Sequence, residues 1–250
     1  MASDALYDRI GRGYGAGRRA DPRIAALIHG ELGETGSILN VGAGTGSYEP
    51  VGRDVTAVEP SQAMIDQRPA GAAPVIQASA EALPFGDDSF DNAMALLTIH
   101  HWPDPRRGLA ELRRVVRGGI VILTCDPLLP QFWLLDYFPD LAALDGDIMP
   151  GRSGIEAVLG PLRRVPVPIP HDCVDGFLCA FWRRPAAYLQ AGVRGRMSSF
   201  ARISGVDDGV ARLAADLASG EWVARYGDVM THDSLDLGYH LLVAGPRGDG

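Results

Sequence analysis

The sequence predicts an α/β fold built on one doubly wound, seven-stranded sheet, with helical insertions that form a lid. Three observations support this prediction. Short β-branched runs alternate with helical stretches, which is typical of βαβ units around a parallel sheet. An apolar run near residue 40 leads directly into a glycine-rich loop. Two aromatic or helical segments, after the fifth and sixth apolar runs, interrupt the alternation. Together these features favour one layered domain that carries a lid.

Each element follows from a local signal. Pro22 and Gly33 bound an expected helix over residues 22–32, and a second helix is expected over 106–116. A short helix over 61–67 would be capped by Ser61. The expected strands are residues 37–41, 54–58, 74–77, 90–97, 119–125, 164–169 and 238–244. A chain of 250 residues with 46% hydrophobic residues can bury one core of this size.

Charge and composition narrow the function classes. The formal net charge of -8 repels a phosphate backbone, so no nucleic-acid partner is expected. No run of about 18 apolar residues is present, so no membrane partner is expected. The N-terminal residues lack a basic patch followed by an apolar stretch, which predicts a cytoplasmic protein. The three cysteines form no Cys-x-x-Cys pair, and His171, His232 and His240 are scattered, so no metal site is expected.

The glycine loop is the strongest local signal. Gly42, Gly44 and Gly46 occupy alternate positions directly after an apolar run. Glycine is needed where the backbone turns sharply or a ligand approaches the main chain. The spacing differs from the dinucleotide fingerprint, in which the last glycine lies one residue further on. Glu49 would oppose a pyrophosphate and Pro50 would interrupt a long helix, so the loop favours another nucleoside.

An acidic residue closes the next expected strand. Glu59 lies 17 positions after Gly42, where a carboxylate can accept hydrogen bonds from both ribose hydroxyls. This pair of signals is shared with dehydrogenases. A third signal argues against a dehydrogenase. A short loop from residue 78, a Leu-Pro-Phe sequence and an acidic turn precede the fourth strand.

These motifs together resemble the class I S-adenosylmethionine-dependent methyltransferases, whose domain is Rossmann-like. The resemblance is closest to the methyltransferase type 11 group, which includes the ubiquinone/menaquinone-biosynthesis methyltransferases. It spans roughly residues 7–125, and residues 1–125 would form the cofactor-binding half of a single domain over 1–250. Residues 127–235 would include the acceptor-side insertions. The matching segments are residues 40–46, 58–61, 80–85, 88–91, 100–102 and 111–115.

The resemblance implies S-adenosylmethionine as cofactor and a small molecule as methyl acceptor. The glycine loop would line the methionine and ribose portions, Glu59 would hold the ribose diol, and residues after the third strand would read adenine. The family often has an acid where Asn40 stands and an Asp where Ser79 stands. The implied cofactor contacts are Tyr14, Arg18, Asn40, Gly42, Ala43, Gly44, Gly46, Glu59, Pro60, Ser61, Ser79, Ala80, Glu81, Leu97 and Thr98.

A general base is required if the acceptor is a hydroxyl or an acidic carbon. His100 and His101 are the candidates because they follow the fourth strand and histidine titrates near neutral pH. The alternative is that both belong to a structural turn. Aromatic residues of the two insertions would roof the acceptor pocket: Trp133, Tyr137, Phe138, Phe177, Phe181 and Trp182.

Two other functions stay open at this point. Asn40 and Ser79 are compatible with a protein that binds S-adenosylmethionine or S-adenosylhomocysteine without turnover. A nicotinamide-dependent oxidoreductase is the other alternative, and the glycine spacing and Pro50 argue against it.

Overall fold

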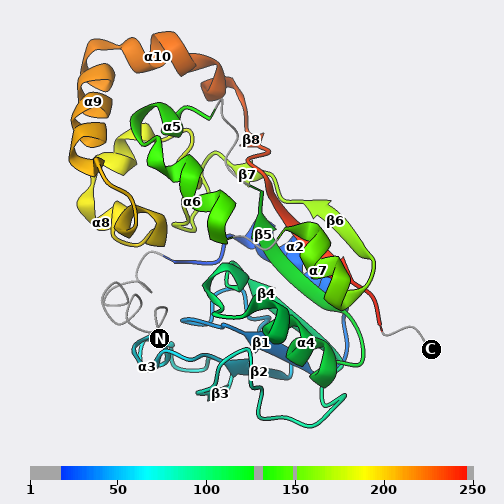
Figure 1. Cartoon of the computed structure of the whole chain (residues 1–250). Helices are drawn as coiled ribbons and strands as arrows, with labels where there is room; N and C mark the ends of the chain where they lie inside the picture. The colour runs from blue at the N-terminus through cyan, green and yellow to red at the C-terminus, as the bar shows by residue number, and fades with distance from the viewer. Residues whose placement is uncertain (1–17, 127–131, 149–150, 247–250) are drawn as a thin grey trace.

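A computed structural model describes residues 18–126, 132–148 and 151–246, and Figure 1 shows its architecture. Seven strands form one sheet in the order β3-β2-β1-β4-β5-β9-β6, which confirms the predicted fold class. The first five strands are parallel, and β9 runs antiparallel to both β5 and β6. The strands are β1 (Ile38–Val41), β2 (Val55–Val58), β3 (Val75–Ile76), β4 (Asn92–Leu96), β5 (Ile120–Cys125), β6 (Leu162–Pro166) and β9 (Tyr239–Ala244).

Helices cover both faces of this sheet. On one face, α2 (Pro22–Leu32) packs against β4 and β5; on the other, α4 (Pro105–Val115) packs beside α7 (Arg152–Leu159). Side chains of a strand alternate between faces. Accordingly Met94 of β4 belongs to the core under α2, whereas its neighbour Ala95 belongs to the core under α4. The result is a three-layer arrangement with two hydrophobic cores.

The insertions form a separate helical mass beside the sheet (Figure 1). We call the described residues 132–148 and 171–233 the cap. A two-stranded sheet of β7 (Ile169–Pro170) and β8 (Ser234–Leu235) lies where the chain enters and leaves the second of these segments. The cap contains α5 (Leu134–Tyr137), α6 (Asp140–Ile148), η2 (Pro185–Leu189), α8 (Ala191–Arg194), η3 (Ser198–Ala201), α9 (Val206–Ser219), α10 (Glu221–Tyr226) and η4 (Gly227–Thr231).

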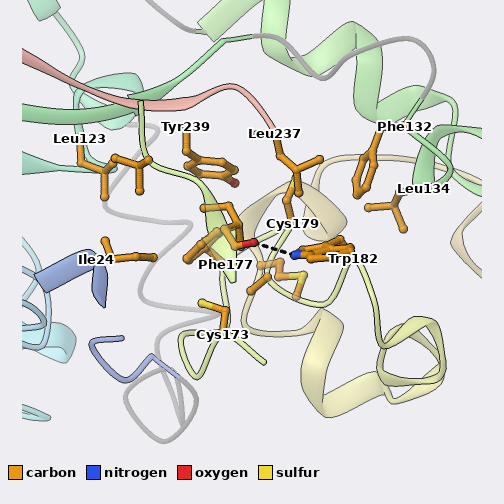
Figure 2. Close-up of a cluster of buried hydrophobic side chains, with 14 of the residues drawn as sticks. Ile24, Leu123, Phe132, Leu134, Cys173, Phe177, Cys179, Trp182, Leu237 and Tyr239 are labelled. Atoms are coloured by element: carbon orange, nitrogen blue, oxygen red, sulfur yellow. Dashed lines mark hydrogen bonds between the residues drawn. The ribbon is translucent and has the colours of Figure 1, made fainter. Parts of the chain in front are cut away.

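The core of the cap is continuous with the core under α2. Figure 2 shows Ile24 of α2 and Leu123 of β5 at one side of the cluster and Trp182 of the cap at the other, with Phe177 and Tyr239 between them. Trp182 is fully buried, and its Nε1 donates to the carbonyl of Ile169 at 3.0 Å. The cap is therefore packed against the sheet through shared apolar side chains.

Two sequence expectations differ from the structure. The strand expected over 164–169 is displaced: β6 ends at Pro166, while Ile169 pairs with Leu235 in the smaller sheet. β6 lies at the edge of the sheet and exposes Arg163 and Arg164, so it lacks the continuous apolar pattern of a central strand. The short helix α3 (Gln62–Ile65) begins after Ser61, but the Ser61 side chain forms no capping hydrogen bond.

None of the helices in the described part of the chain is both long and apolar enough to cross a bilayer.

Candidate functional site

A cavity of about 460 Å³ opens at the carboxyl ends of the parallel strands. β1 marks the point where the strand order reverses, since β2 lies on one side of it and β4 on the other. Ligands of open α/β sheets bind at this position. The cavity receives Asn40 from β1, Glu59 from the end of β2, Ser79 after β3, Leu97 after β4 and Leu123 from β5. Its volume is typical of a site for a small molecule.

The glycine loop forms one wall of this cavity. The backbone N–H groups of Gly42 and Ala43 both donate to the carbonyl of Val58, at 2.8 and 3.0 Å, which holds the loop against the end of β2. Gly42 has a φ of +70°, and a Cβ atom there would lie 2.0 Å from Thr98 Oγ1. The loop therefore requires glycine at residue 42 both for its backbone conformation and for its close approach to Thr98.

Glu59 is oriented by two backbone donors. Gly44 N–H donates to Oε2 at 2.7 Å, and Ser61 N–H donates to Oε1 at 3.0 Å. The side chain is buried, with 6% of its surface exposed, and lies in the cavity wall. These two bonds, one to each oxygen, fix the plane of the carboxylate.

Ser61 supplies a buried polar atom without a partner. Its Oγ is buried in the cavity wall and makes no hydrogen bond among the described residues. Buried hydroxyl groups are normally hydrogen-bonded, and an exception requires an explanation such as a ligand. The Ser61 hydroxyl thus does not cap α3, and the residue lines the cavity instead.

A buried ion pair supports the loop from behind. Arg68 Nη2 contacts both oxygens of Glu49, at 2.7 and 2.8 Å, and Arg68 Nη1 donates to the carbonyl of Gly44 at 3.3 Å. Glu49 also accepts from Asn40 Nδ2 at 3.0 Å. Both charged side chains are less than a tenth exposed. Glu49 therefore orients the Asn40 amide and, through Arg68, the glycine loop.

The end of β4 carries local backbone strain. Leu97 has a φ of +51°, in the left-handed region that residues other than glycine rarely adopt. Its N–H donates to the carbonyl of Leu123 at 2.8 Å, which ties the strained residue to β5. The next residue, Thr98, accepts a hydrogen bond from Trp102 Nε1 at 3.3 Å. Strained residues of this kind are found most often at functional sites.

The two candidate histidines lie on the short helix η1 (Ile99–His101). Their rings are 3.8 Å apart, and His101 lines the cavity whereas His100 does not. Burial, with the positive charges of Arg202 and Arg18, lowers the pKa of His100 to about 4. Burial also lowers the pKa of His101 well below its usual range, and His100 and the same arginines contribute. Both imidazoles are therefore neutral at pH 7.

A carboxylate of the cap contacts two residues of the cavity wall. Asp175 contacts Arg18 Nε through Oδ1 at 2.6 Å and accepts from the Tyr48 hydroxyl through Oδ2 at 2.9 Å. Arg18 and Tyr48 both line the cavity. Burial and the charge of Asp175 raise the pKa of Tyr48, so its hydroxyl stays protonated and acts as the donor. Asp175 is not predictable from the sequence, because nothing local distinguishes it from a surface acid.

The structure brings most of the residues predicted from the sequence to this one cavity. Gly46 is not in the wall; a Cβ atom there would meet Glu49 and Arg68 instead. His100 is not in the wall either, and Tyr14 lies outside the described residues. The predicted residues that do line the cavity are Arg18, Asn40, Gly42, Ala43, Gly44, Glu59, Pro60, Ser61, Ser79, Ala80, Glu81, Leu97, Thr98 and His101.

The six aromatic residues expected to roof an acceptor pocket do not line this cavity. Trp133 is representative: it is 2% exposed, stacks edge-on against Trp222 and Tyr188, and donates from Nε1 to the carbonyl of Trp182. These side chains form the interior of the cap and its junction with the sheet.

The fold and the cavity define an open α/β protein with a small-molecule site at the carboxyl ends of its parallel strands. Residues 39–123 match a family model described as a methyltransferase domain. The crystal structure of an Anabaena variabilis ATCC 29413 protein, named as a methyltransferase from an antibiotic biosynthesis pathway, is 35% identical to this chain. It matches with a TM-score of 0.85 over 91% of this chain and 98% of that one. The chain belongs to the S-adenosylmethionine-dependent methyltransferase family.

Two curated relatives each match about half of the chain. The rice chloroplastic 2-methyl-6-phytyl-1,4-hydroquinone methyltransferase 1 is 32% identical over 133 residues, which are 48% of this chain and 40% of the rice protein. A ubiquinone/menaquinone biosynthesis C-methyltransferase of Geobacter sp. (strain M21) is 32% identical over 156 residues, which are 55% of this chain and 66% of the relative. The chain thus spans about two fifths of the length of the rice protein.

Proposed function

We propose that the chain binds S-adenosylmethionine in the cavity at the ends of β1, β2 and β4 and transfers its methyl group to a small-molecule acceptor. One observation carries the proposal: the oriented Glu59 carboxylate and the unpartnered Ser61 hydroxyl share a wall with the glycine loop, in which Gly42 has no space for a side chain. This donor and acceptor set suits a nucleoside with a ribose diol.

The order of the strands predicts how the cofactor lies. Ser79, Ala80 and Glu81 follow β3 and would border adenine, and Glu59 at the end of β2 would bind the ribose hydroxyls. Asn40 lies in β1 directly before the glycine loop, and Arg18 contacts that loop through Ser47, so the amino-acid portion would be placed beside them. Because Glu49 holds the Asn40 amide through Nδ2, Asn40 Oδ1 is the atom suited to accept from the amino group.

The bound cofactor supplies a methyl group on a positively charged sulfur, and the electron pair of the broken carbon–sulfur bond remains on that sulfur. The protein contributes alignment and exclusion of water, and alignment alone can lower a barrier by about 7–11 kcal/mol. The apolar side chains of Leu97 and Leu123 lie in the cavity wall, which suits a transition state whose charge is dispersing.

His101 is the proposed general base. Its imidazole is in the cavity wall and neutral at pH 7, so it can accept the proton that an acceptor hydroxyl or acidic carbon releases. A lowered pKa makes it a weak base, and it therefore suits an acceptor whose own proton is acidic, such as a phenol or hydroquinone. The names of the rice and Geobacter relatives make quinol-type acceptors the first to test.

The proposal is tested in two steps. Calorimetry with S-adenosylhomocysteine should show one site per chain, and the exposed variant Glu34→Gln should bind equally well. Incubation with methyl-labelled cofactor and a panel of hydroquinones, phenols, amines and 1,3-dicarbonyls should then yield a labelled product. Absence of cofactor binding would refute the proposal. Tight binding without transfer to any of these acceptors would favour a binding protein without turnover.

A further inference from the structure

Asp175 is the best-connected buried charge of the cap. It is fully buried, and four donors surround its carboxylate. Oδ1 accepts from Arg18 Nε at 2.6 Å and from Gly176 N–H at 2.8 Å, while Oδ2 accepts from the Tyr48 hydroxyl at 2.9 Å and from Arg18 Nη2 at 3.3 Å. A carboxylate accepts about four hydrogen bonds, so Asp175 is fully satisfied where it lies.

These contacts join three segments that are distant in the sequence. Arg18 precedes α2, Tyr48 ends the glycine loop, and Asp175 lies in the cap after β7. Arg18 and Tyr48 line the cavity, whereas Asp175 does not. The Ser47 hydroxyl also donates to the Arg18 carbonyl at 3.4 Å. The cap therefore reaches this end of the cavity through two side chains that a single carboxylate holds.

Tyr48 depends on such contacts for its conformation. Its φ of +67° lies in the left-handed region, which side chains with a Cβ atom adopt only when their surroundings impose it. The ring is 4% exposed, its hydroxyl accepts from Asp21 N–H at 3.4 Å, and its carbonyl is 2.9 Å from His29 Nε2. The hydrogen bond from the Tyr48 hydroxyl to Asp175 adds a contact that the cap contributes.

We propose that Asp175 is a positioning residue for the cofactor. It holds the Arg18 guanidinium and the Tyr48 ring at the end of the cavity that receives the amino-acid portion, so that the cap completes the cofactor site. This inference rests on the proposed function. Asp175 acts through Arg18 and Tyr48 and touches no ligand itself.

The placement of Arg18 follows from the sheet. Along the order β3-β2-β1-β4, adenine and ribose are assigned to the ends of β3 and β2. The loop after β1 is then the place for the amino acid, and Arg18 contacts that loop through Ser47. A guanidinium oriented by a buried carboxylate suits recognition of a second carboxylate, because its planar fork presents several donors in fixed directions.

The test compares two ligands that differ only at the amino-acid end. S-Adenosylhomocysteine carries the amino and carboxylate groups, and 5′-methylthioadenosine lacks them. Calorimetry on the full chain should show that Asp175→Asn weakens binding of S-adenosylhomocysteine about tenfold or more, the effect expected for one charge-assisted interaction. Affinity for 5′-methylthioadenosine should change less than about twofold, and the number of sites should stay the same.

A matched control lies three residues away. Asp172 is on the same segment and pairs with Arg23 at 2.7 Å, but its side chain is 58% exposed and does not line the cavity. Asp172→Asn should leave the affinity for both ligands unchanged. A general loosening of this segment would instead affect both variants.

A double-mutant cycle separates positioning from structural support. Because Asp175 acts through Arg18 and Tyr48, Asp175→Asn should weaken S-adenosylhomocysteine binding less in an Arg18→Met background than in the unmodified chain. Equal losses for the two ligands, additive losses in the cycle, or an unchanged affinity of Asp175→Asn would each overturn the inference. Should Asp175→Asn not fold, Tyr48→Phe decides: a loss confined to S-adenosylhomocysteine supports the inference, and no loss overturns it.

The failure of the inference differs from failure of the proposed function. If the unmodified chain binds neither ligand, the proposed function is wrong. If it binds both and Asp175→Asn binds them as well as the unmodified chain does, only the positioning role is wrong.

Discussion

Replacement of Gly42 by alanine tests the geometry of the glycine loop. The residue has a φ of +70°, and the added Cβ atom would lie 2.0 Å from Thr98 Oγ1 and 2.8 Å from Thr98 Cβ. Thr98 cannot turn toward solvent without cost, because it is 8% exposed and accepts a hydrogen bond from Trp102 Nε1. The substitution should therefore destabilise the folded chain as well as deform the cavity.

The magnitude follows from three contributions. A left-handed conformation at alanine costs about 1–2 kcal/mol. A displaced Thr98 side chain costs about 0.5–1.5 kcal/mol for a poor rotamer. Loss of its hydrogen bond from Trp102 costs about 0.5–1.5 kcal/mol. The expected loss in free energy of unfolding is thus about 2–5 kcal/mol.

Gly44 provides the matched control. It also has a positive φ, of +53°, but a Cβ atom there would meet only the terminal methyl of Met64 at 3.4 Å. Gly44→Ala should therefore cost only the conformational contribution, about 1–2 kcal/mol. Urea denaturation followed by circular dichroism measures both variants. If Gly42→Ala is no less stable than Gly44→Ala, the contact with Thr98 does not constrain the loop and the reasoning fails.

Three further predictions concern the acid and the histidines. Glu59→Gln should weaken S-adenosylhomocysteine binding about tenfold to a hundredfold in calorimetry, because Gly44 and Ser61 donate to different oxygens of Glu59 and an amide places a donor NH₂ group at one of these positions; unchanged affinity would contradict this. His101→Ala should lower kcat by about 10²–10⁴ in a steady-state methyl-transfer assay, and His100→Ala by less than tenfold; equal effects would remove His101 as the base. The pKa of His100 is lowered to about 4, so the unfolded chain binds more protons between pH 6.5 and 4. Stability should therefore fall as the pH drops through that range, with a smaller fall for His100→Gln; urea midpoints measured at several pH values should show this difference.

Local signals predicted the sheet and one side of the site. The helix expected over 22–32 has those same bounds, since Asp21 caps it, Pro22 occupies its first turn and Gly33 ends it. The glycine loop and Glu59 were predictable because each follows an apolar strand at a fixed spacing. Features that depend on immediate neighbours in the sequence are therefore accessible without a structure.

The edge strand of the sheet and the contacts between distant residues were harder to predict from the sequence. β6 exposes two arginines at the edge of the sheet, so its apolar pattern is weak and its predicted position was displaced toward Ile169. Arg68 contacts Glu49 across 19 residues, and Asp175 contacts Tyr48 across 127. No sequence spacing fixes such contacts, because they depend on how distant segments pack after the strands have assembled.

The aromatic composition of the cap predicted a cover over the acceptor pocket. It did not predict how the cap contacts the residues of the cavity. Its aromatic residues are conspicuous in the sequence, yet Trp133 packs against both Tyr188 and Trp222, and all three are buried. Large apolar side chains gain most by leaving water, so they fill the interior that gives the cap a fixed shape. A polar residue can then act at a distance because that shape is fixed. Asp175 is such a residue: it is buried at the junction of the cap with the sheet, and its four donors leave the carboxylate one orientation.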